Sequence, residues 1–294
     1  MGVAELSEAV KDCPELLIRL EEPLAAHVPL RVGGPAEAWA EARSLVALER
    51  FTAAARATNT RWRLHWPFSD WLVRDGGLQG AVLRLGTDFE SIEITDDTAV
   101  VGSAALWSSL PPELAGGLWD AIREWPGTVG ALVQHGDPSQ LSRLVTGLQV
   151  LRGGRVVDLS WNDTELPPKM GDSTVLLSIT MRRATASRTW LTPPPSPGTL
   201  FQNVNDAIIG KELHKAGVLG TRLRSWRLST VEPGTIVHLG RGSFQDLAML
   251  LKGVKVRVEK TRGITLEPRI PILGTNQRPA IQNRFAAQPQ RDTP

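Results

Sequence analysis

Residues Trp125–Gly136 read WPGTVGALVQHG, and the interpretation of the whole chain starts from them. An aliphatic run is entered through Pro126-Gly127 and interrupted by Gly130. Proline fixes one backbone angle and glycine frees the next, so the stretch predicts a tight, specifically shaped turn. Successive exposed N–H groups in such a turn form a nest that can hold a pyrophosphate. A purely structural turn between a helix and a strand is the alternative, and these residues alone leave both open.

Composition places the chain among globular proteins. It has 294 residues, 41% of them hydrophobic, and a formal net charge of +2. That charge balance argues against a nucleic-acid partner and against a polybasic membrane patch. One cysteine, Cys13, excludes an internal disulfide and a cysteine metal site. The five histidines show no ligand spacing, and the lack of tyrosine removes one type of catalytic acid.

The expected location is the cytoplasm. No apolar run in the sequence approaches the roughly 20 residues that cross a bilayer. The first residues, MGVAELSEAVKDCPELL, lack the basic segment and apolar core of a secretory signal. We therefore expect a chain without a membrane span.

Apolar periodicity and turn residues predict helices mixed with strands along the whole chain. Residues 1–22 are read as a short amphipathic helix, and Ser44 caps a second helix. Two hairpins are expected, one over Asp96-Asp97 and one over Gly153-Gly154.

A Pro/Ser/Thr-rich link at 184–197 marks the expected domain boundary. Beyond it we predict a helix ending at Gly217, two short strands, and a longer helix. Ser243 at the N-cap and Asp246 three residues later mark the start of that longer helix. The polar residues 275–294 are expected to be a disordered tail.

Six motifs, in collinear order over about residues 20–274, resemble the UDP-N-acetylenolpyruvoylglucosamine reductase (UDP-N-acetylmuramate dehydrogenase) family. They are PLAAHVPLRVGGPAEAW, VRDGGLQGAVLRLG, WPGTVGALV, SPGTLFQN, KAGVLG and GITLEPRIPILG. The resemblance implies an α+β fold: an FAD-binding domain of the vanillyl-alcohol oxidase type in two parts, and a C-terminal α/β substrate-type domain. With it, the chain divides into a helix at 1–22, an FAD-binding-like domain at 23–190, a reductase-type domain at 198–274 and the tail. The family uses FAD and NADPH to make UDP-N-acetylmuramate in peptidoglycan synthesis.

The cofactor motifs depart from that family. Its first diphosphate cradle is a Gly-x-Gly-Ser-Asn loop, which here reads Trp66-Pro67-Phe68-Ser69-Asp70, with Ser69 as the only remnant. Pro67 has no N–H, and two aromatic rings stand where a phosphate must touch the backbone. The second cradle keeps Pro126, Gly127, Thr128, Val129 and Gly130, but Ala131 replaces the next glycine.

The catalytic motifs depart as well. Thr199 stands where the family has a proton-donating serine, and its extra methyl group restricts the hydroxyl. Arg269 stands where the family has a glutamate that stabilises the enol intermediate. Glu267, two residues away, is a conceivable substitute, although displaced along the strand. Lys169 is the nearest cation to the position of the family's missing arginine.

The joint loss of these groups predicts a fold that has been kept and a site that has been discarded. The main hypothesis is a catalytically inactive, flavin-free homologue that binds a protein partner in cell-wall synthesis or division. An active FAD- and NADPH-dependent reductase is the alternative. A third reading keeps nucleotide-sugar binding through Arg222, Arg224 and Arg227, although a solvated basic face explains the same residues. We further expect Trp62, Trp66 and Trp71 to fill the vacated flavin cavity, since an empty one costs stability.

Overall fold

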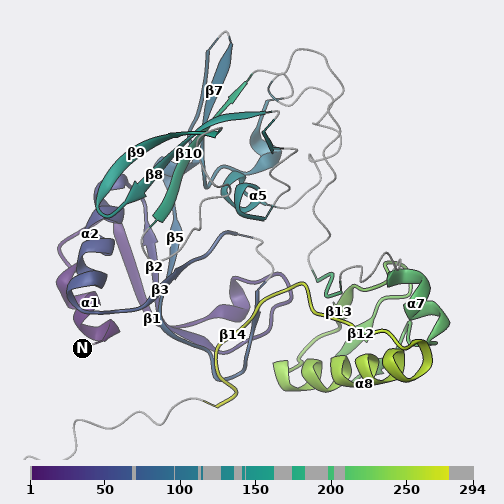
Figure 1. The fold of residues 1–294 in the computed structure, drawn as a ribbon. Coiled ribbons are helices and arrows are strands. Elements are labelled where there is room, and N and C mark those ends of the chain that lie inside the picture. The colour runs from purple at the N-terminus through teal and green to yellow at the C-terminus, as the bar shows by residue number, and fades with distance from the viewer. Residues whose placement is uncertain are drawn as a thin grey trace, which may run out of the picture.

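The chain mixes helices with several small sheets, which confirms the predicted α+β class (Figure 1). The computed structural model describes residues 2–67, 71–95, 97–111, 114, 127–135, 141–142, 144–161, 174–182, 198–201 and 209–277. Several predictions fall outside these ranges: the helix at 111–124 apart from residues 111 and 114, the link at 184–197, Lys169, and the tail beyond residue 277. The limits 23–190 and 198–274 remain predictions.

The N-terminal sheet has four strands in the order β1-β2-β5-β3. Strand β1 pairs antiparallel with β2, whereas β2 and β3 both pair parallel with β5. Helix α2 packs against β1 and β2, and Ser44 caps it by accepting the N–H of Ala47, as predicted. The elements are α1 (Val3–Ala9), β1 (Leu16–Pro23), η1 (Leu24–Ala26), β2 (Pro35–Ala42), α2 (Leu45–Ala57), β3 (Trp62–Leu64) and β5 (Leu78–Leu85).

The helix predicted over residues 1–22 is wrong in its second half. Helix α1 ends at Ala9, and Leu16–Pro23 is the edge strand of the sheet. Strand β1 has a buried residue at Leu16 and mostly exposed or half-exposed residues after it. An edge strand with one weakly buried face leaves little alternation in the sequence, so pairing with β2 decides the conformation.

The second sheet is fully antiparallel, in the order β6-β7-β10-β8-β9. Both predicted hairpins are present in it: β6 with β7, and β8 with β9 across Gly153-Gly154. Helix α5 lies beside this sheet and contacts β7 and β10 (Figure 1). The elements are η2 (Thr87–Glu90), β6 (Ile92–Ile94), β7 (Thr98–Gly102), η3 (Trp107–Ser109), α5 (Val129–His135), β8 (Val145–Arg152), β9 (Arg155–Ser160) and β10 (Thr174–Arg182).

A smaller C-terminal unit holds helix α8 against a three-stranded antiparallel sheet, β11-β12-β13 (Figure 1). Ser243 accepts the N–H of Asp246 at the start of α8, and Gly263 closes the helix in the left-handed conformation. The elements are α7 (Ile209–Lys215), β11 (Arg222–Leu223), β12 (Trp226–Leu228), β13 (Ile236–His238), α8 (Phe244–Arg262) and β14 (Ile272–Leu273).

Three connections tie the C-terminal unit to the N-terminal part. Strand β14 pairs parallel with β4 (Leu72–Val73). The ring of His238 bridges the two parts, because its Nδ1 lies 2.9 Å from the carbonyl oxygen of Leu30 while its Nε2 accepts the N–H of Gly242. Since Nε2 is the acceptor, Nδ1 carries the ring hydrogen and donates a hydrogen bond to the carbonyl oxygen of Leu30.

Asp75 forms the third connection. Its carboxylate accepts the N–H of Phe244 at 2.8 Å and that of Gln245 at 3.0 Å, the first two helical residues of α8. The guanidinium of Arg74 lies over the Phe244 ring at 5.3 Å. Asp75 sits in the turn that contains Gly77, where an ideal Cβ would lie 2.0 Å from the carbonyl oxygen of Pro35. The double glycines of this motif therefore allow the close backbone packing that places Asp75 at the start of α8.

We predict that Asp75→Asn lowers the free energy of unfolding by about 1 kcal/mol, and Asp75→Ala by about 2 kcal/mol. Both changes leave N–H groups of α8 without their charged acceptor. Urea unfolding followed by circular dichroism measures the loss. Asp12→Asn, at an exposed aspartate, is the matched control and should change stability little. Equal effects at both positions would contradict the capping role.

Candidate functional site

The turn at Gly127–Gly130, within the stretch Trp125–Gly136, is buried in the core. Gly127, Thr128, Val129 and Gly130 are all buried. The N–H of Val129 donates to Ala105 at 2.9 Å, and that of Gly130 donates to Ser103 at 2.7 Å. The N–H of Ala131 donates to the Thr128 hydroxyl at 3.3 Å. Three successive N–H groups are thus taken by the protein itself.

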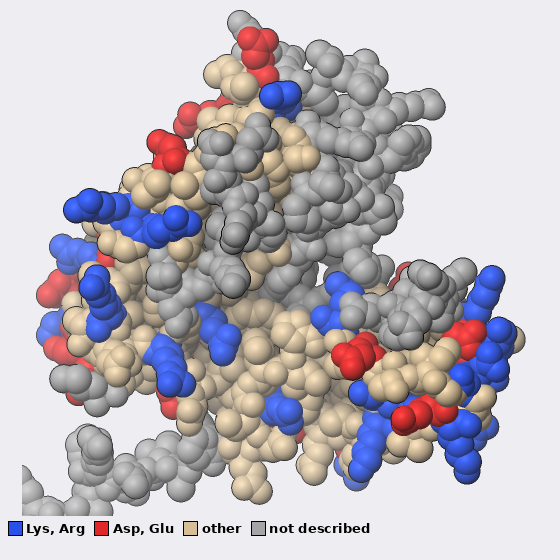
Figure 2. Space-filling view, in the orientation of Figure 1, with Lys and Arg blue, Asp and Glu red and all other residues tan. Residues whose placement is uncertain are grey.

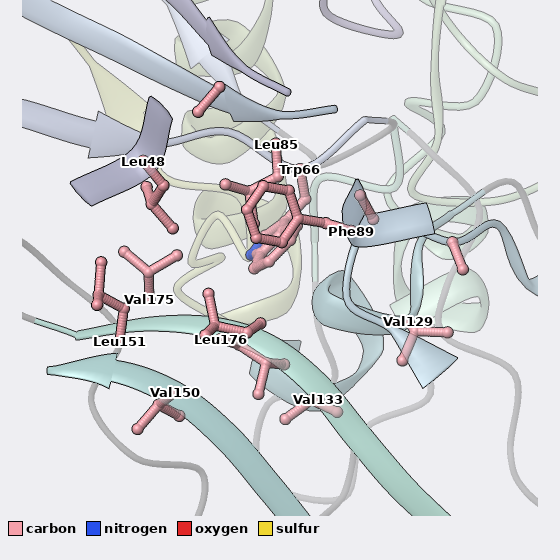
Figure 3. Close-up of a cluster of buried hydrophobic side chains, with 14 of the residues drawn as sticks. Leu48, Trp66, Leu85, Phe89, Val129, Val133, Val150, Leu151, Val175 and Leu176 are labelled. Carbon is pink, nitrogen blue, oxygen red and sulfur yellow. The ribbon is translucent and has the colours of Figure 1, made fainter. Parts of the chain in front are cut away.

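Trp66 covers the same turn. Its indole packs so closely that an ideal Cβ on Gly130 would lie 2.4 Å from the ring. The indole N–H donates to the Gln134 side chain at 2.5 Å, and Trp66 is only 2% exposed. Figure 3 shows Trp66 among the buried side chains that join the two larger sheets, with Leu85 and Leu176 of the same cluster nearby. The lack of a side chain at Gly130 leaves room for the Trp66 ring, which occupies the space that a ligand would need.

An FAD diphosphate does not fit this turn. A diphosphate cradle needs backbone N–H groups that point to open space and a surface that the phosphates can reach. Here the N–H groups of Val129, Gly130 and Ala131 have partners, and an indole fills the space against Gly130. Pro126 of this turn and Ser69 of the other cradle lie outside the described residues, so this conclusion applies to Gly127–Gly130 only.

The structure brings Thr199 and Arg269 together, as the family motifs require. The N–H of Arg269 donates to Leu200 at 2.7 Å, and its Nε donates to the Thr199 carbonyl at 3.3 Å. The Thr199 hydroxyl lies 3.1 Å from the hydroxyl of Thr235. A guanidinium only donates hydrogen bonds, so it offers no carboxylate oxygen in this position. Glu267, the conceivable substitute, is exposed to solvent.

The three arginines considered for nucleotide-sugar binding lie on strands β11 and β12 and the turn between them. All are exposed, on a C-terminal unit where Lys and Arg gather (Figure 2). Arg222 and Arg227 are cross-strand partners. Arg224 forms an ion pair with Asp246 at 3.1 Å. The solvated basic face and the nucleotide-sugar reading both remain compatible with this arrangement.

A cavity of about 840 Å³ lies next to the covered turn. Its walls come from the segment after η1, from β2 and β5, and from the backbone at Ala104–Leu106 that pairs with the turn. The rings of His27 and Trp39, which line it, stack at 3.8 Å. His65 and Arg84 also line it. Of the expected aromatic filling, Trp66 contacts the turn, whereas Trp62 packs on Phe51 and Trp71 packs on His65.

His65 is held neutral in this wall. Burial, followed by the charges of His27 and Arg84, lowers the pKa of His65 from 6.5 to about 3. A backbone hydrogen bond with His27, the smallest of the causes, raises the pKa of His65. Neither ring nitrogen has a hydrogen-bond partner of ordinary geometry within the described residues. The stretch WRLHWPFSDWLV predicts aromatic packing, but nothing in its residue pattern predicts a neutral, buried histidine.

Two other kinds of site find no support in the part of the chain that the structure describes. Among those residues, no three His, Cys, Asp or Glu side chains gather to hold a metal ion. Within the same ranges, no helix is long and apolar enough to cross a membrane.

We predict that His65 makes the protein less stable as the pH falls. The unfolded chain takes up a proton near pH 6.5, whereas folded His65 does so only near pH 3, so acid favours unfolding between these values. Between about pH 7 and about pH 5 this one group removes about 2 kcal/mol of stability.

His65→Phe should remove that part of the pH dependence in urea unfolding. His214→Phe, at an exposed histidine of α7, should leave it in place. Parallel stability curves for the wild type and His65→Phe would show that His65 is protonated in the folded protein.

Comparison with known proteins agrees with the motif order. The family model of the UDP-N-acetylenolpyruvoylglucosamine reductase C-terminal domain matches residues 190–273. UDP-N-acetylenolpyruvoylglucosamine reductase 2 of Symbiobacterium thermophilum is 29% identical, with 88% of this chain and 93% of that protein covered. The reductase of Anoxybacillus flavithermus is 25% identical, with 87% and 94% covered.

The crystal structure of the reductase (MurB) from Thermus caldophilus has the same fold. It superposes with a TM-score of 0.68 at 19% identity, and the match covers 88% of this chain and 99% of that one. The fold that the resemblance implied is therefore confirmed. The six motifs in order, the matching C-terminal domain and the relatives that align over nearly their whole length all support the UDP-N-acetylenolpyruvoylglucosamine reductase family.

Proposed function

We propose that this chain is a flavin-free, catalytically inactive member of its family that acts as a binding or scaffold protein in peptidoglycan synthesis or cell division. The observation that carries the proposal is the covered turn. The N–H groups of Val129, Gly130 and Ala131 are bonded internally, and Trp66 lies against Gly130. The N–H groups that a diphosphate would need are hydrogen-bonded within the protein instead.

The second line of support is the chemistry around Thr199. Reduction of an enol ether needs a proton donor next to the substrate carbon. The Thr199 hydroxyl interacts with Thr235, and Arg269 supplies a fixed positive charge in place of the family's carboxylate. Glu267 is exposed on the surface, so among the described residues it is not buried beside Thr199 as a replacement for that carboxylate.

The alternative is an active reductase that uses FAD and NADPH to make UDP-N-acetylmuramate. The relatives favour it, because both are called reductases and this chain aligns with 94% and 93% of their lengths. It requires the covered turn to open and Trp66 to move. That rearrangement exposes a buried indole and breaks at least two backbone hydrogen bonds, each worth about 1 kcal/mol.

A cytoplasmic location and a protein partner belong to the proposal. Nucleotide-sugar binding without redox chemistry is compatible with it, since the exposed Arg222 and Arg227 suit a diphosphate. A relative that binds no flavin but keeps its fold and surface can still position other proteins or sense the nucleotide sugar.

The purified protein is expected to be colourless. Without FAD in the cleft, its spectrum lacks the visible absorption band of an oxidised flavin, and it does not oxidise NADPH when given UDP-N-acetylenolpyruvoylglucosamine. Adding excess FAD should leave both readings unchanged. A family member with intact glycine-rich cradles, prepared in the same way, is the positive control. Copurified flavin, or turnover of that substrate, would establish the active-reductase alternative.

Trp66→Ala should destabilise the protein by about 3–5 kcal/mol, because it leaves a cavity against Gly130. Flavin should still not bind, since the turn's N–H groups keep their partners. Urea unfolding and a flavin titration measure the two effects, and Trp66→Phe serves if the alanine variant does not fold. Trp71→Ala, at a half-buried tryptophan, is the control and should cost less. Tight flavin binding by a folded Trp66 variant would contradict the role given to the N–H groups.

A further inference from the structure

The hairpin of β6 and β7 carries unpaired negative charge together with exposed apolar side chains. Residues 86–103 include five acids and neither lysine nor arginine. The acids are Asp88, Glu90, Glu93, Asp96 and Asp97. The four that the structure describes, all but Asp96, are exposed and form no ion pair with another described residue. Ile94 and Val100 of the same hairpin are 44% and 39% exposed.

Carboxylates of the N-terminal sheet, by contrast, have partners within the chain. Glu22 pairs with Arg19 at 3.2 Å, Glu41 pairs with Arg43 at 2.9 Å, and Glu37 accepts the N–H of Gly80 at 2.7 Å. Among the described residues, the charges of the hairpin take no part in the ion pairs that hold a single copy together.

Helix α8 presents the opposite charge on its outer face. Met249, Lys252, Val256 and Lys260 follow one another at intervals of three or four residues, so their side chains share one face of the helix. All four are exposed, Met249 to 48% and Val256 to 55%. Over residues 252–262 the helix has one acid, Glu259, and five cations, which are Lys252, Lys255, Arg257, Lys260 and Arg262. Among the described residues, Arg262 alone of these cations forms an ion pair, with Glu212.

These two surfaces lie at opposite ends of the molecule. The hairpin projects from the second sheet, and α8 lies along the lower edge of the C-terminal unit (Figure 1). Figure 2 shows acidic atoms at the hairpin end and Lys and Arg over the C-terminal unit. One copy therefore cannot bring its own hairpin onto its own helix. Two α8 faces placed together would repel each other, because both are positively charged.

The chemistry of the α8 face selects an acidic partner that also has apolar side chains. Its lysines attract carboxylates, whereas Met249 and Val256 leave water only against another apolar surface. A phosphate backbone would neutralise the lysines and leave both apolar side chains exposed. The hairpin offers charge and apolar surface side by side, since Glu93 and Val100 are cross-strand neighbours. The chain thus carries a surface that matches its own helix.

We propose that the acidic β6–β7 hairpin of one copy docks on the basic face of α8 in a second copy, with the apolar side chains at the centre and the charges around them. Because the two surfaces differ, the contact is head-to-tail, and contacts of this kind build rings or open filaments. The inference goes beyond the proposed function and stands without it, since both surfaces lie outside the six family motifs. It supplies a means by which a scaffold extends.

Sedimentation velocity of the full chain tests the proposal. We expect the mean mass to rise with protein concentration at about 50 mM salt, where the screening length exceeds about 10 Å. It should fall to the mass of one chain at about 1 M salt, where that length is about 3 Å. Strand β7 has only five residues, so the contact is small. We therefore expect weak association, with a Kd on the order of 10–100 μM.

Two double variants, each with one surface neutralised, locate the contact. Lys252→Gln with Lys260→Gln changes the helix face, and Glu93→Gln with Asp97→Asn changes the hairpin. Each should weaken self-association at low salt by about tenfold or more. Mixed in equal amounts, the two should form a two-chain species and nothing larger, because the mixture joins one intact hairpin to one intact helix face.

The matched control removes the same charge elsewhere. Arg50→Gln with Arg63→Gln, at exposed arginines of the N-terminal part, should associate as the wild type does. All substituted side chains are exposed, so each variant is expected to keep its fold, and circular dichroism checks this.

A wild type that stays a single chain at low salt and millimolar protein concentration would overturn the proposal. So would variants that associate as the wild type does, or a mixture that stays as single chains. Binding of a monomeric wild type to vesicles of anionic phospholipid, or to duplex DNA, would assign the α8 face to a membrane or to nucleic acid instead. The flavin spectrum is read separately, because copurified flavin contradicts the proposed function and leaves this inference intact.

Discussion

A buried backbone N–H must have a partner, and this constraint shapes the centre of the molecule. The turn at Gly127–Gly130 lies in the core between the two larger sheets, where water does not reach it. Its N–H groups bond to Ser103 and Ala105, and this pairing ties α5 to the segment that follows β7. Trp66 then packs on the flat surface that Gly130 leaves open. The same geometry that suits an anion in a solvent-facing turn becomes a structural joint when the turn is buried.

Sequence patterns predicted most of the elements because these depend on local chemistry. Ser44 and Ser243 cap α2 and α8 as expected, and Gly153-Gly154 turns a hairpin between β8 and β9. The failure at residues 1–22 has a non-local cause, since β1 is a strand only because β2 lies beside it. The motif order predicted the family and fold, which are properties of the whole chain.

The candidate site was only partly predictable. The sequence identified Gly127–Gly130, Thr199 and Arg269 by their place in motifs, but gave no indication of what their backbone groups bond to. The cluster around His65 joins residues from the segment after η1, from β2 and from β5, and neither spacing nor composition brings such residues together. Asp75 lies inside a recognised motif, yet its role at the start of α8 depends on a contact across 169 positions of sequence. Which polar groups lose contact with water, and which partners the N–H groups find, is decided only when the chain is folded.

Strand β4 and its partner β14 have a consequence for the order of assembly. Leu72 and Val73 are made early, but the residues they pair with, Ile272 and Leu273, are among the last of the described chain. During synthesis, which proceeds from the N-terminus, the middle of the protein must wait for its closing strand. A nascent chain in which Ile272 and Leu273 have not yet left the ribosome would therefore hold its N-terminal sheet beside a strand β4 that still lacks its partner.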